Sequence, residues 1–277
     1  AGQGARIAWS LAVEGRVERL LAAGGMLFAV TREGRIMAFG ADQGKEKNWS
    51  DTPRPLAPSA EAANRAEQLL RRTEAREGYA LWFQADDEPL LEAVLAGSDL
   101  HVVVVDSDAG RVARLRRRFE AAGWYGRRVA VQAGDPLAFR PPRHMASLIV
   151  VGRSLAERLS DNETLGTLYE SLRPYGGRLW VPAEDPVAAE KRFAEAGLAK
   201  AKLAQADRAV VITREGSLPG AADWTHAYGD IANTVKSNDQ RVRLPLGLLW
   251  FGGNSNLDVL PRHGHGPSPQ VVGGRLF

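Results

Sequence analysis

Hydrophobic and polar positions in the central part of the chain form a repeating pattern of strands and helices. Short apolar runs such as 101–105, HVVVV, have the length of buried strands. Longer segments such as 109–122 carry apolar residues at helical spacing. This alternation predicts an α/β fold, a mostly parallel sheet with helices on both faces. The expected strands are 79–83, 101–105, 129–132, 146–151 and 178–181, the expected helices are 60–76, 89–96, 109–122, 164–172 and 188–196, and 201–204 with 209–213 form a closing hairpin.

The pattern changes at both ends of the chain. Near the start, short apolar runs flank Gly24-Gly25, which predicts a β-hairpin. The Pro-rich stretch 50–60, SDTPRPLAPSA, is typical of a linker. After Gly216 helix signals become rare, and the final VVGGRLF returns to the pattern of the first segment. We therefore expect an all-β segment over 1–53, an α/β domain over 54–218 and a β and loop segment over 219–277.

The composition is that of an ordinary globular protein, with 44% hydrophobic and 25% charged residues among 277. The absence of cysteine excludes disulfides, thiolate metal sites and Cys nucleophiles. No apolar run has the length of a membrane span, and the first residues lack a signal-peptide pattern. The net charge of +3 is weak evidence for a nucleic-acid partner. We interpret the basic run RVARLRRRFE as the solvated face of a helix and expect the chain to be a piece of a longer one.

The candidate chemistry lies where the expected parallel strands end, because open α/β sheets bind ligands at the carboxyl ends of their strands. Three places follow from the pattern: the turn 84–88, QADDE, after the first strand, Asp106 at the end of the second, and Asp135 after the third.

Residues 62–214 resemble the class I S-adenosylmethionine-dependent methyltransferases, whose fold is Rossmann-like. The resemblance rests on the order of these three motifs along the chain, on the stretch GWYGRRVAVQAGDP and on the late PYGG turn. The resemblance implies that Asp106 binds the ribose hydroxyls of S-adenosylmethionine and that Asp135 meets the adenine amino group. It also implies a first turn of Gly-x-Gly-x-Gly, whose first two glycine positions correspond to Gln84 and Asp86. These four residues are the expected cofactor-binding set.

The first turn departs from the family pattern, since Gln84, Asp86 and Glu88 stand at the three glycine positions. Side chains there would partly fill the cofactor pocket, and the acids would repel the carboxylate of the methionine part. The acids and Pro89 also suit the start of a helix, which explains them without a cofactor. Two hypotheses stay open: a methyltransferase with a divergent cofactor turn, and a catalytically degenerate domain that serves as a scaffold or interaction module. A nicotinamide-dependent oxidoreductase is a weaker third, because its Gly-rich turn is equally absent.

The terminal segments resemble a second family. GGMLFAV, GRIMAF, ADQGK and Trp49 are similar to the repeat of PQQ-like (quinoprotein-type) β-propellers. The stretch DWTHAYGDIANTVKSND resembles large planctomycete-type proteins in which a methyltransferase-like domain is inserted in such a propeller. This resemblance implies the remaining propeller blades, on a longer parent chain or a partner chain, as the partner. It favours a periplasmic or secreted parent, whereas an active methyltransferase would favour the cytoplasm, and it does not imply PQQ as a cofactor.

Histidines are the remaining candidates for chemistry. His144 and Arg153 flank the fourth expected strand, and His144 is a candidate general base, although a surface histidine is the favoured interpretation. The His-x-His pair of His263 and His265 could bind Zn or Cu together with His226. We favour polar loop residues over a metal site, so no metal is expected, and no catalytic residue is assigned.

Overall fold

The computed structural model describes residues 9–41, 52–159, 162–242, 245 and 269–277. The chain divides into two compact units, residues 1–51 and 52–277. The boundary expected after residue 53 lies near this division and stays an expectation. The expected boundary at 218 stays an expectation. Within the described segments, no helix combines the length and the apolar character needed to cross a membrane.

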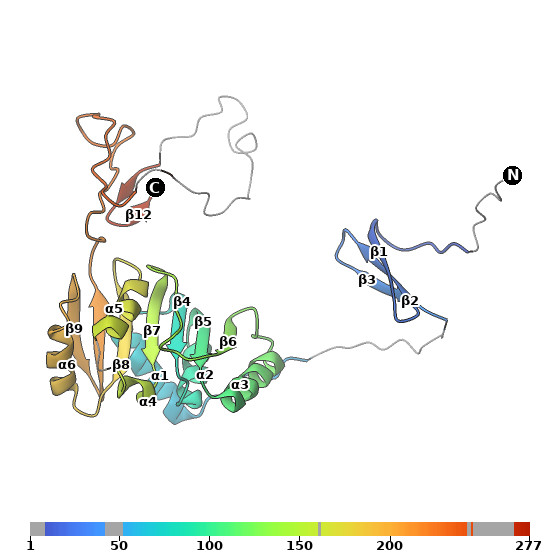
Figure 1. The fold of residues 1–277 in the computed structure, drawn as a ribbon, viewed down its shortest axis with the longest axis horizontal. Helices are drawn as coiled ribbons and strands as arrows, with labels where there is room; N and C mark the ends of the chain where they lie inside the picture. The colour runs from blue at the N-terminus through green and yellow to red at the C-terminus, as the bar shows by residue number, and fades with distance from the viewer. Residues whose placement is uncertain (1–8, 42–51, 160–161, 243–244, 246–268) are drawn as a thin grey trace. The chain divides into compact units, whose positions relative to one another are not determined.

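The first unit holds a three-stranded antiparallel sheet in the order β1-β2-β3 (Figure 1). Its strands are β1 (Val17–Ala23), β2 (Met26–Thr31) and β3 (Ile36–Phe39). The predicted hairpin is confirmed, because Gly24 and Gly25 adopt φ of +56° and +74° between β1 and β2, as a two-residue turn of this kind requires. A propeller blade is not shown, since this sheet has three strands and Trp49 lies outside the described residues.

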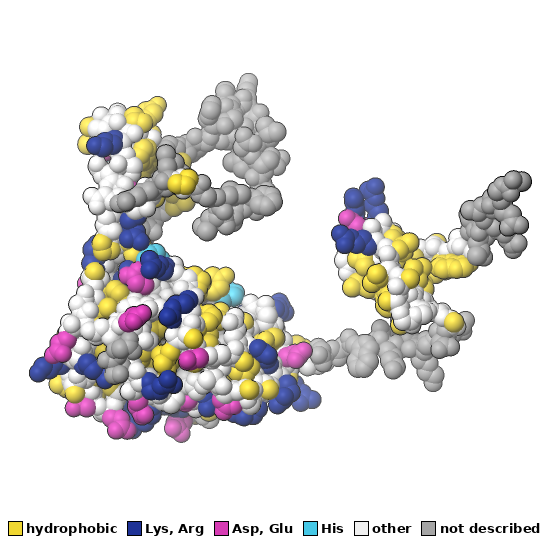
Figure 2. All heavy atoms as spheres, in the orientation of Figure 1, with side chains coloured by type: hydrophobic (Ala, Val, Ile, Leu, Met, Phe, Trp, Pro, Cys, Tyr) yellow, Lys and Arg dark blue, Asp and Glu magenta, His cyan; other side chains and the backbone are white. Residues whose placement is uncertain are grey.

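This small sheet leaves most of its apolar side chains uncovered. Every residue of β1 is exposed, and Leu20 and Ile36 are among the largest exposed hydrophobic side chains. Figure 2 shows hydrophobic side chains spread over its visible face. Three strands with a hydrophobic face are the minimum for an independently stable sheet, and the described part of the first unit contains no element that covers this face.

The second unit is built on a seven-stranded sheet in the order β6-β5-β4-β7-β8-β10-β9. Strands β4 to β8 run parallel, and β10 runs antiparallel to both β8 and β9. This confirms the mostly parallel sheet and the closing hairpin, and the order of the five parallel strands is that of a Rossmann-like fold. The strands are β4 (Glu77–Phe83), β5 (Asp99–Asp106), β6 (Val129–Ala133), β7 (Ala146–Val151), β8 (Gly177–Pro182), β9 (Ala201–Ala206) and β10 (Ala209–Arg214).

Helices cover both faces of this sheet (Figure 1). One core joins α1 to α3 with alternate residues of β4 and β5, including Leu69, Trp82 and Val104. The other joins α4 to α6 with the opposite residues, such as Phe83 and Ile149. Buried strand faces explain the apolar runs, since parallel strands are covered on both sides. The helices are α1 (Ala60–Thr73), α2 (Glu88–Ala96), α3 (Ala109–Ala121), α4 (Arg153–Ala156), α5 (Asn162–Ser171) and α6 (Pro186–Ala194), of which only α4 was not predicted.

The segment after β10 consists of turns and a short hairpin of β11 (Val271–Val272) and β12 (Arg275–Leu276). Trp224 pairs with Val271 through two backbone hydrogen bonds. Arg241 donates to the Nε2 side of His144 at 3.2 Å, which ties this segment to the amino-terminal end of β7. The segment therefore meets the sheet at the edge opposite to the carboxyl ends of the parallel strands.

Candidate functional site

The candidate site follows from the strand order. The chain runs outward from β4 in both directions, to β5 and β6 on one side and to β7 and β8 on the other. The carboxyl ends of β4 and β7 therefore mark the switch point where α/β sheets form a ligand crevice. The structure brings the predicted residues to this edge: Gln84 and Asp86 follow β4, and Asp106 ends β5.

The turn after β4 starts helix α2, as the acids and the proline predicted. Asp87 is the N-cap, and its Oδ1 accepts from the Leu90 backbone N–H at 3.0 Å. Arg65 of α1 pairs with the Asp87 carboxylate. A carboxylate at a helix start satisfies free N–H groups and complements the helix dipole. The capping interpretation of this turn is confirmed for Asp87.

Asp86 connects the two sides of the switch point. Its Oδ2 accepts from the backbone N–H of Ser154 at 2.9 Å and from the Ser154 hydroxyl at 2.7 Å. Its Oδ1 accepts from Arg111 of α3 at 3.2 Å. Asp86 thus joins the β4 turn to the start of α4 after β7 and to α3 after β5. A glycine at this position could make none of these side-chain contacts.

Gln84 retains the backbone conformation that favours glycine. Its φ is +62°, and it is the single residue of the turn 84–88 in the left-handed region. Its backbone N–H donates to the Val105 carbonyl at 2.9 Å, and its Oε1 accepts from the Ser107 hydroxyl at 3.1 Å. A non-glycine residue in this conformation carries strain. Of the three positions matched to glycine, only the first still has the glycine-type geometry.

Gly152 allows the ends of β4 and β7 to approach closely. A Cβ at this position would overlap the carbonyl oxygen of Gln84 and would also crowd the carboxylate of Asp86. The Gly152 backbone N–H donates to the Phe83 carbonyl at 2.7 Å. The crevice is therefore narrow at the point where the two strands diverge.

Asp106 is wholly buried, with 0% of its surface exposed. Its Oδ2 accepts from the Ala85 backbone N–H at 2.8 Å and from Nη1 of Arg111 at 2.9 Å. Its Oδ1 accepts from the Asp108 backbone N–H at 2.8 Å. Buried carboxylates are stable only when they are paired and hydrogen-bonded, and this one receives all its partners from the chain itself.

Arg111 is the centre of an acidic cluster at this edge. Its side chain is 18% exposed, pairs with Asp106 and Asp86, and lies 3.8 Å from Asp108. Burial alone lowers the pKa of the Arg111 guanidinium, but the hydrogen bond and charge of Asp106 raise it above its ordinary value. The backbone N–H of Arg111, by donating to the Asp108 carboxyl, lowers the pKa of that acid. The guanidinium therefore stays charged and holds three carboxylates together.

The interpretation of the basic run 111–120 as a solvated face holds for Arg114, Arg116, Arg117 and Arg118, which are exposed, but not for the half-buried Arg111. Arg111 turns into the site, and Arg116 donates to the Val131 carbonyl at 2.8 and 2.9 Å. Arg114 pairs with Glu88 at 2.8 Å, and Arg118 pairs with Glu92 of α2. These side chains are long enough to reach across from α3 to neighbouring elements, which helical spacing alone does not reveal.

Asp135 is exposed and caps its own turn. Its Oδ1 accepts from the Leu137 backbone N–H at 3.0 Å. The preceding Gly134 donates its N–H to the Asp106 carbonyl at 3.0 Å, so the two acids lie on adjacent parts of one edge. The predicted proximity of Asp106 and Asp135 follows from the pairing of β5 with β6.

A nucleoside does not fit at Asp106 in this arrangement. Ribose hydroxyls require accessible carboxylate oxygens, whereas both oxygens of Asp106 are buried and hydrogen-bonded within the chain. Among the described residues, no buried side-chain nitrogen or oxygen lacks a partner. Nothing at this edge therefore requires a ligand to complete it.

A hollow of about 780 Å³ opens beside the crevice, between α1 and the carboxyl ends of β4, β7 and β8. Trp180, Leu90 and Arg153 line it, together with the turn between β9 and β10. Its volume lies within the roughly 300–1,000 Å³ that is typical of small-molecule sites. No sequence pattern indicates this hollow, because its walls come from elements far apart in the chain.

The histidines that the structure describes are not gathered in one place. His144 lies before β7 and Arg153 after it, so they lie at opposite ends of that strand. His226 is exposed, with its Nδ1 at 2.8 Å from the Thr225 hydroxyl, whereas His263 and His265 lie outside the described residues. The described part of the chain contains no group of three acidic or histidine side chains that could hold a metal.

Comparisons with known proteins show similarity to solved structures only. No family model and no curated protein matches the sequence. The chain is similar to a solved structure of a putative S-adenosyl-L-methionine-dependent methyltransferase from Methanococcus maripaludis, with 14% identity and a TM-score of 0.48 over 57% of this chain and 86% of that one. It is also similar to a SAM-dependent methyltransferase from Aquifex aeolicus, with 12% identity and a TM-score of 0.42 over 53% and 87%.

A putative methyltransferase from Escherichia coli is a further similar structure, with 16% identity and a TM-score of 0.42 over 59% of this chain and 90% of that one. Similarities at this level carry no argument about activity or cofactor. The mostly parallel sheet and its closing hairpin rest on the strand pairing itself, and the function rests on the residues of the site.

Proposed function

We propose that the α/β domain is a methyltransferase-like module that does not bind S-adenosylmethionine at the β4–β5 edge and serves as a scaffold or binding module. The observation that carries this proposal is the complete burial of Asp106 together with its three internal hydrogen-bond partners. The acid that resembles the ribose-binding residue of the family then stabilises the fold instead.

The physical argument is one of competition. A ribose could reach Asp106 only after Arg111 had moved away from Asp106 and Asp86. Breaking a largely buried ion pair leaves an unpaired buried charge, which is strongly unfavourable. Two ribose hydroxyls, which are neutral donors, form weaker hydrogen bonds with a carboxylate than a guanidinium does. The internal partner is thus favoured over the nucleoside.

One observation favours the alternative, a methyltransferase with a divergent cofactor turn. Gln84 keeps a glycine-type φ of +62°, and a hollow of about 780 Å³ opens next to the crevice. In that case the cofactor would have to displace Arg111 as it binds. The two functions therefore differ in a measurable property, the affinity for S-adenosylmethionine and its dependence on Asp106.

Calorimetric titration with S-adenosylmethionine and S-adenosylhomocysteine separates them. We expect no binding heat at millimolar ligand for the wild type. Asp106→Asn keeps the size of the side chain and removes its charge, and Asp99→Asn at the exposed, opposite end of the same strand is the matched control. Micromolar binding that is lost in Asp106→Asn and kept in Asp99→Asn would overturn the proposal and support the methyltransferase.

We further propose that the three-stranded sheet of the first unit packs against other β-sheets, as the resemblance to propeller blades implies. Its exposed apolar side chains support this. The hairpin β11–β12 also supports it, because Gly273 and Gly274 adopt φ of +56° and +77°, close to the values of Gly24 and Gly25. Both hairpins read Gly-Gly-x-Leu-Phe.

Hydrogen exchange tests this part of the proposal. Backbone amides of β1 to β3 should exchange much faster than those of a stable core in the 277-residue protein, because the described part of the first unit has no second layer over the sheet. Amides of β4 and β5 in the same sample are the internal reference for a stable sheet. Equal protection of both sheets would show that the small sheet needs no partner.

A further inference from the structure

Two hollows meet at the carboxyl ends of β7 and β8. The larger, of about 780 Å³, lies on the α1 side of the sheet, and the smaller, of about 320 Å³, lies between α4 and α6. Arg153, Pro182 and Arg208 line both. Arg153 is the first residue of α4, and Arg208 belongs to the turn between β9 and β10. Two arginines from distant parts of the chain thus form a shared rim.

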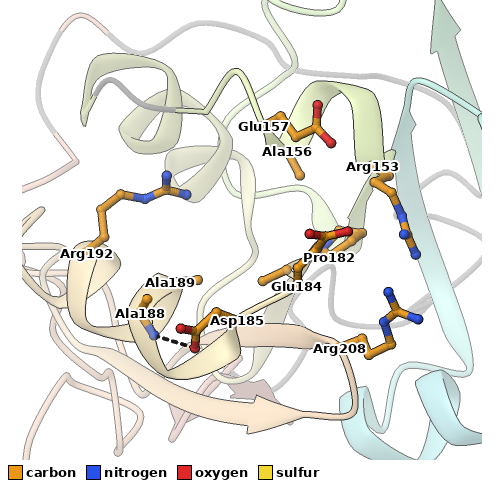
Figure 3. A pocket seen from close by; sticks show the side chains of 11 residues that line it. Arg153, Ala156, Glu157, Pro182, Glu184, Asp185, Ala188, Ala189, Arg192 and Arg208 are labelled. Carbon is orange, nitrogen blue, oxygen red and sulfur yellow. Dashed lines mark hydrogen bonds between the residues drawn. The ribbon is translucent and has the colours of Figure 1, made fainter.

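The two guanidinium groups point toward one another across this rim (Figure 3). Within the described residues, the side chains of Arg153 and Arg208 take part in no hydrogen bond or ion pair, and only their backbone carbonyls accept hydrogen bonds. Two like charges that face each other repel, and an anion placed between them removes the repulsion and pairs with both. This contrasts with Arg111, whose charge is neutralised by Asp106 and Asp86.

Three of the carboxylates that line the two hollows already have partners of their own. Asp86 accepts from Ser154 and Arg111, and Asp87 accepts from Leu90 and pairs with Arg65. Asp185 caps α6 by accepting from the backbone N–H groups of Val187 and Ala188 at 3.0 Å. These three acids therefore do not neutralise the rim.

Two further acids, Glu157 and Glu184, line only the smaller hollow. In the described part of the chain, neither forms an ion pair with Arg153 or Arg208. Because a carboxylate repels an anion, these glutamates disfavour an anion inside the smaller hollow. Glu61 and Asp207 line the larger hollow in the same way, so the anion is expected on the rim between the two guanidinium groups and not inside either hollow.

The wall of the larger hollow includes a flat aromatic side chain. Trp180 of β8 is half-buried and packs against Ala206, Ala209 and Val211, so its ring is held in place. The ring lines the larger hollow near Arg208. Aromatic rings of this kind bind flat apolar groups by stacking or edge contacts.

We propose that Arg153, Arg208 and Trp180 form a binding site for a small molecule that joins a flat apolar ring to an oxyanion. The oxyanion, a carboxylate or a phosphate, lies between the two guanidinium groups, and the ring lies on Trp180 in the larger hollow. This site goes beyond the proposed scaffold function and uses none of the residues that bury Asp106. Its test is therefore independent of the titration with S-adenosylmethionine.

Calorimetry with three probes of one ring system tests the site: 1-naphthyl phosphate, 1-naphthoate and neutral 1-naphthol. We expect at least one of the two anions to bind, at least about tenfold more tightly than the naphthol, since a charge-assisted hydrogen bond is stronger than a neutral one. The tighter anion identifies the source of the oxyanion. Arg153→Gln and Arg208→Gln should each lower the affinity for it at least about tenfold, and Trp180→Leu should lower it for both anions.

Arg158→Gln is the matched control, because Arg158 is exposed, lies just after α4 and lines neither hollow. It should bind the anion as the wild type does. Both rim arginines are exposed and unpaired, so their variants should unfold at the wild-type temperature, which thermal scans check. No binding of either anion at millimolar concentration, equal binding of the naphthol, or equal losses in Arg158→Gln would each overturn the proposal.

Discussion

The ends of β5 and β8 belong to one edge of one sheet, yet their charged groups have opposite surroundings. At β5, Asp106 is buried and receives every hydrogen bond from the chain. Next to β8, Arg153 and Arg208 face each other across two hollows without a carboxylate partner in the described residues. The place of a charged side chain in the fold therefore does not decide whether a ligand can bind to it. What decides is whether other residues already form hydrogen bonds or ion pairs with that side chain.

The largest loss of stability should come from Asp106→Ala, which removes the buried carboxylate at the end of β5. The change leaves Arg111 and two backbone N–H groups without their acceptor, and removing one partner of a buried pair costs about 3–5 kcal/mol. Urea denaturation should therefore show a much lower midpoint. Asp135→Ala at the same edge removes an exposed turn cap and should cost about 1 kcal/mol or less. Similar small losses in both variants would mean that Asp106 is not a structural residue.

An intermediate loss of stability is expected from Gly152→Ala, because the added methyl group would push the ends of β4 and β7 apart. The new Cβ would overlap the Gln84 carbonyl, so the backbone has to shift, and such overpacking costs about 1–3 kcal/mol. Gly166→Ala is the control, because a Cβ in the middle of α5 meets nothing within 4 Å and should stabilise the helix by up to about 1 kcal/mol. Thermal unfolding measures both. Equal behaviour of the two variants would argue against the close approach of β4 and β7.

The smallest effect concerns pH and uses the opposite edge of the sheet as a reference. His144 lies between Arg214, at 3.3 Å from Nδ1, and Arg241, at 3.2 Å from Nε2, with Arg143 and Glu170 also near. Burial, followed by the charge of Arg214, lowers the pKa of His144 below its ordinary 6.5. The neutral ring is therefore the form that the folded protein prefers.

The sign of the effect follows by linkage. The unfolded chain takes up the proton first, so the stabilisation is complete above about pH 6.5 and declines as the pH falls toward the lowered pKa. His144→Asn, which tolerates the φ of +63° at this position, should flatten that decline in unfolding curves recorded between pH 7.5 and 5. Binding of 1-naphthyl phosphate or 1-naphthoate at the distant rim should be the same in the variant and the wild type. A decline that is equally steep in the variant would assign it to other groups.

Most of the α/β fold could be predicted because periodicity reports burial. The strand 146–151 and the helix 109–122 were predicted to within a residue, since apolar runs and helical stripes record which faces are covered. The four-residue α4 was not predicted, because it is too short for a stripe and depends on Asp86, a residue 68 positions away from Ser154.

The site was harder to predict than the fold. Sequence order placed Gln84, Asp86 and Asp106 at the correct edge, because strands alternate with helices in a regular way. It did not indicate that Arg111 satisfies Asp106, although the spacing of Asp108 and Arg111 on one helix start offered a weak signal. The facing pair of Arg153 and Arg208 depends on the return of the β9–β10 hairpin to the sheet. No local pattern contains that information.

The central claim is that hydrogen bonds within the chain occupy Asp106 at the end of β5 and keep a nucleoside from binding there. The backbone amide of Ala85, one of the groups that donate to Asp106, reports on this directly. This N–H donates to Asp106 Oδ2 at 2.8 Å in the buried network. Its nuclear magnetic resonance signal and its hydrogen-exchange rate can be followed while S-adenosylhomocysteine is added to millimolar concentration. The account predicts slow exchange and an unchanged signal throughout. A saturable shift of the Ala85 signal that is abolished by Asp106→Asn would contradict it.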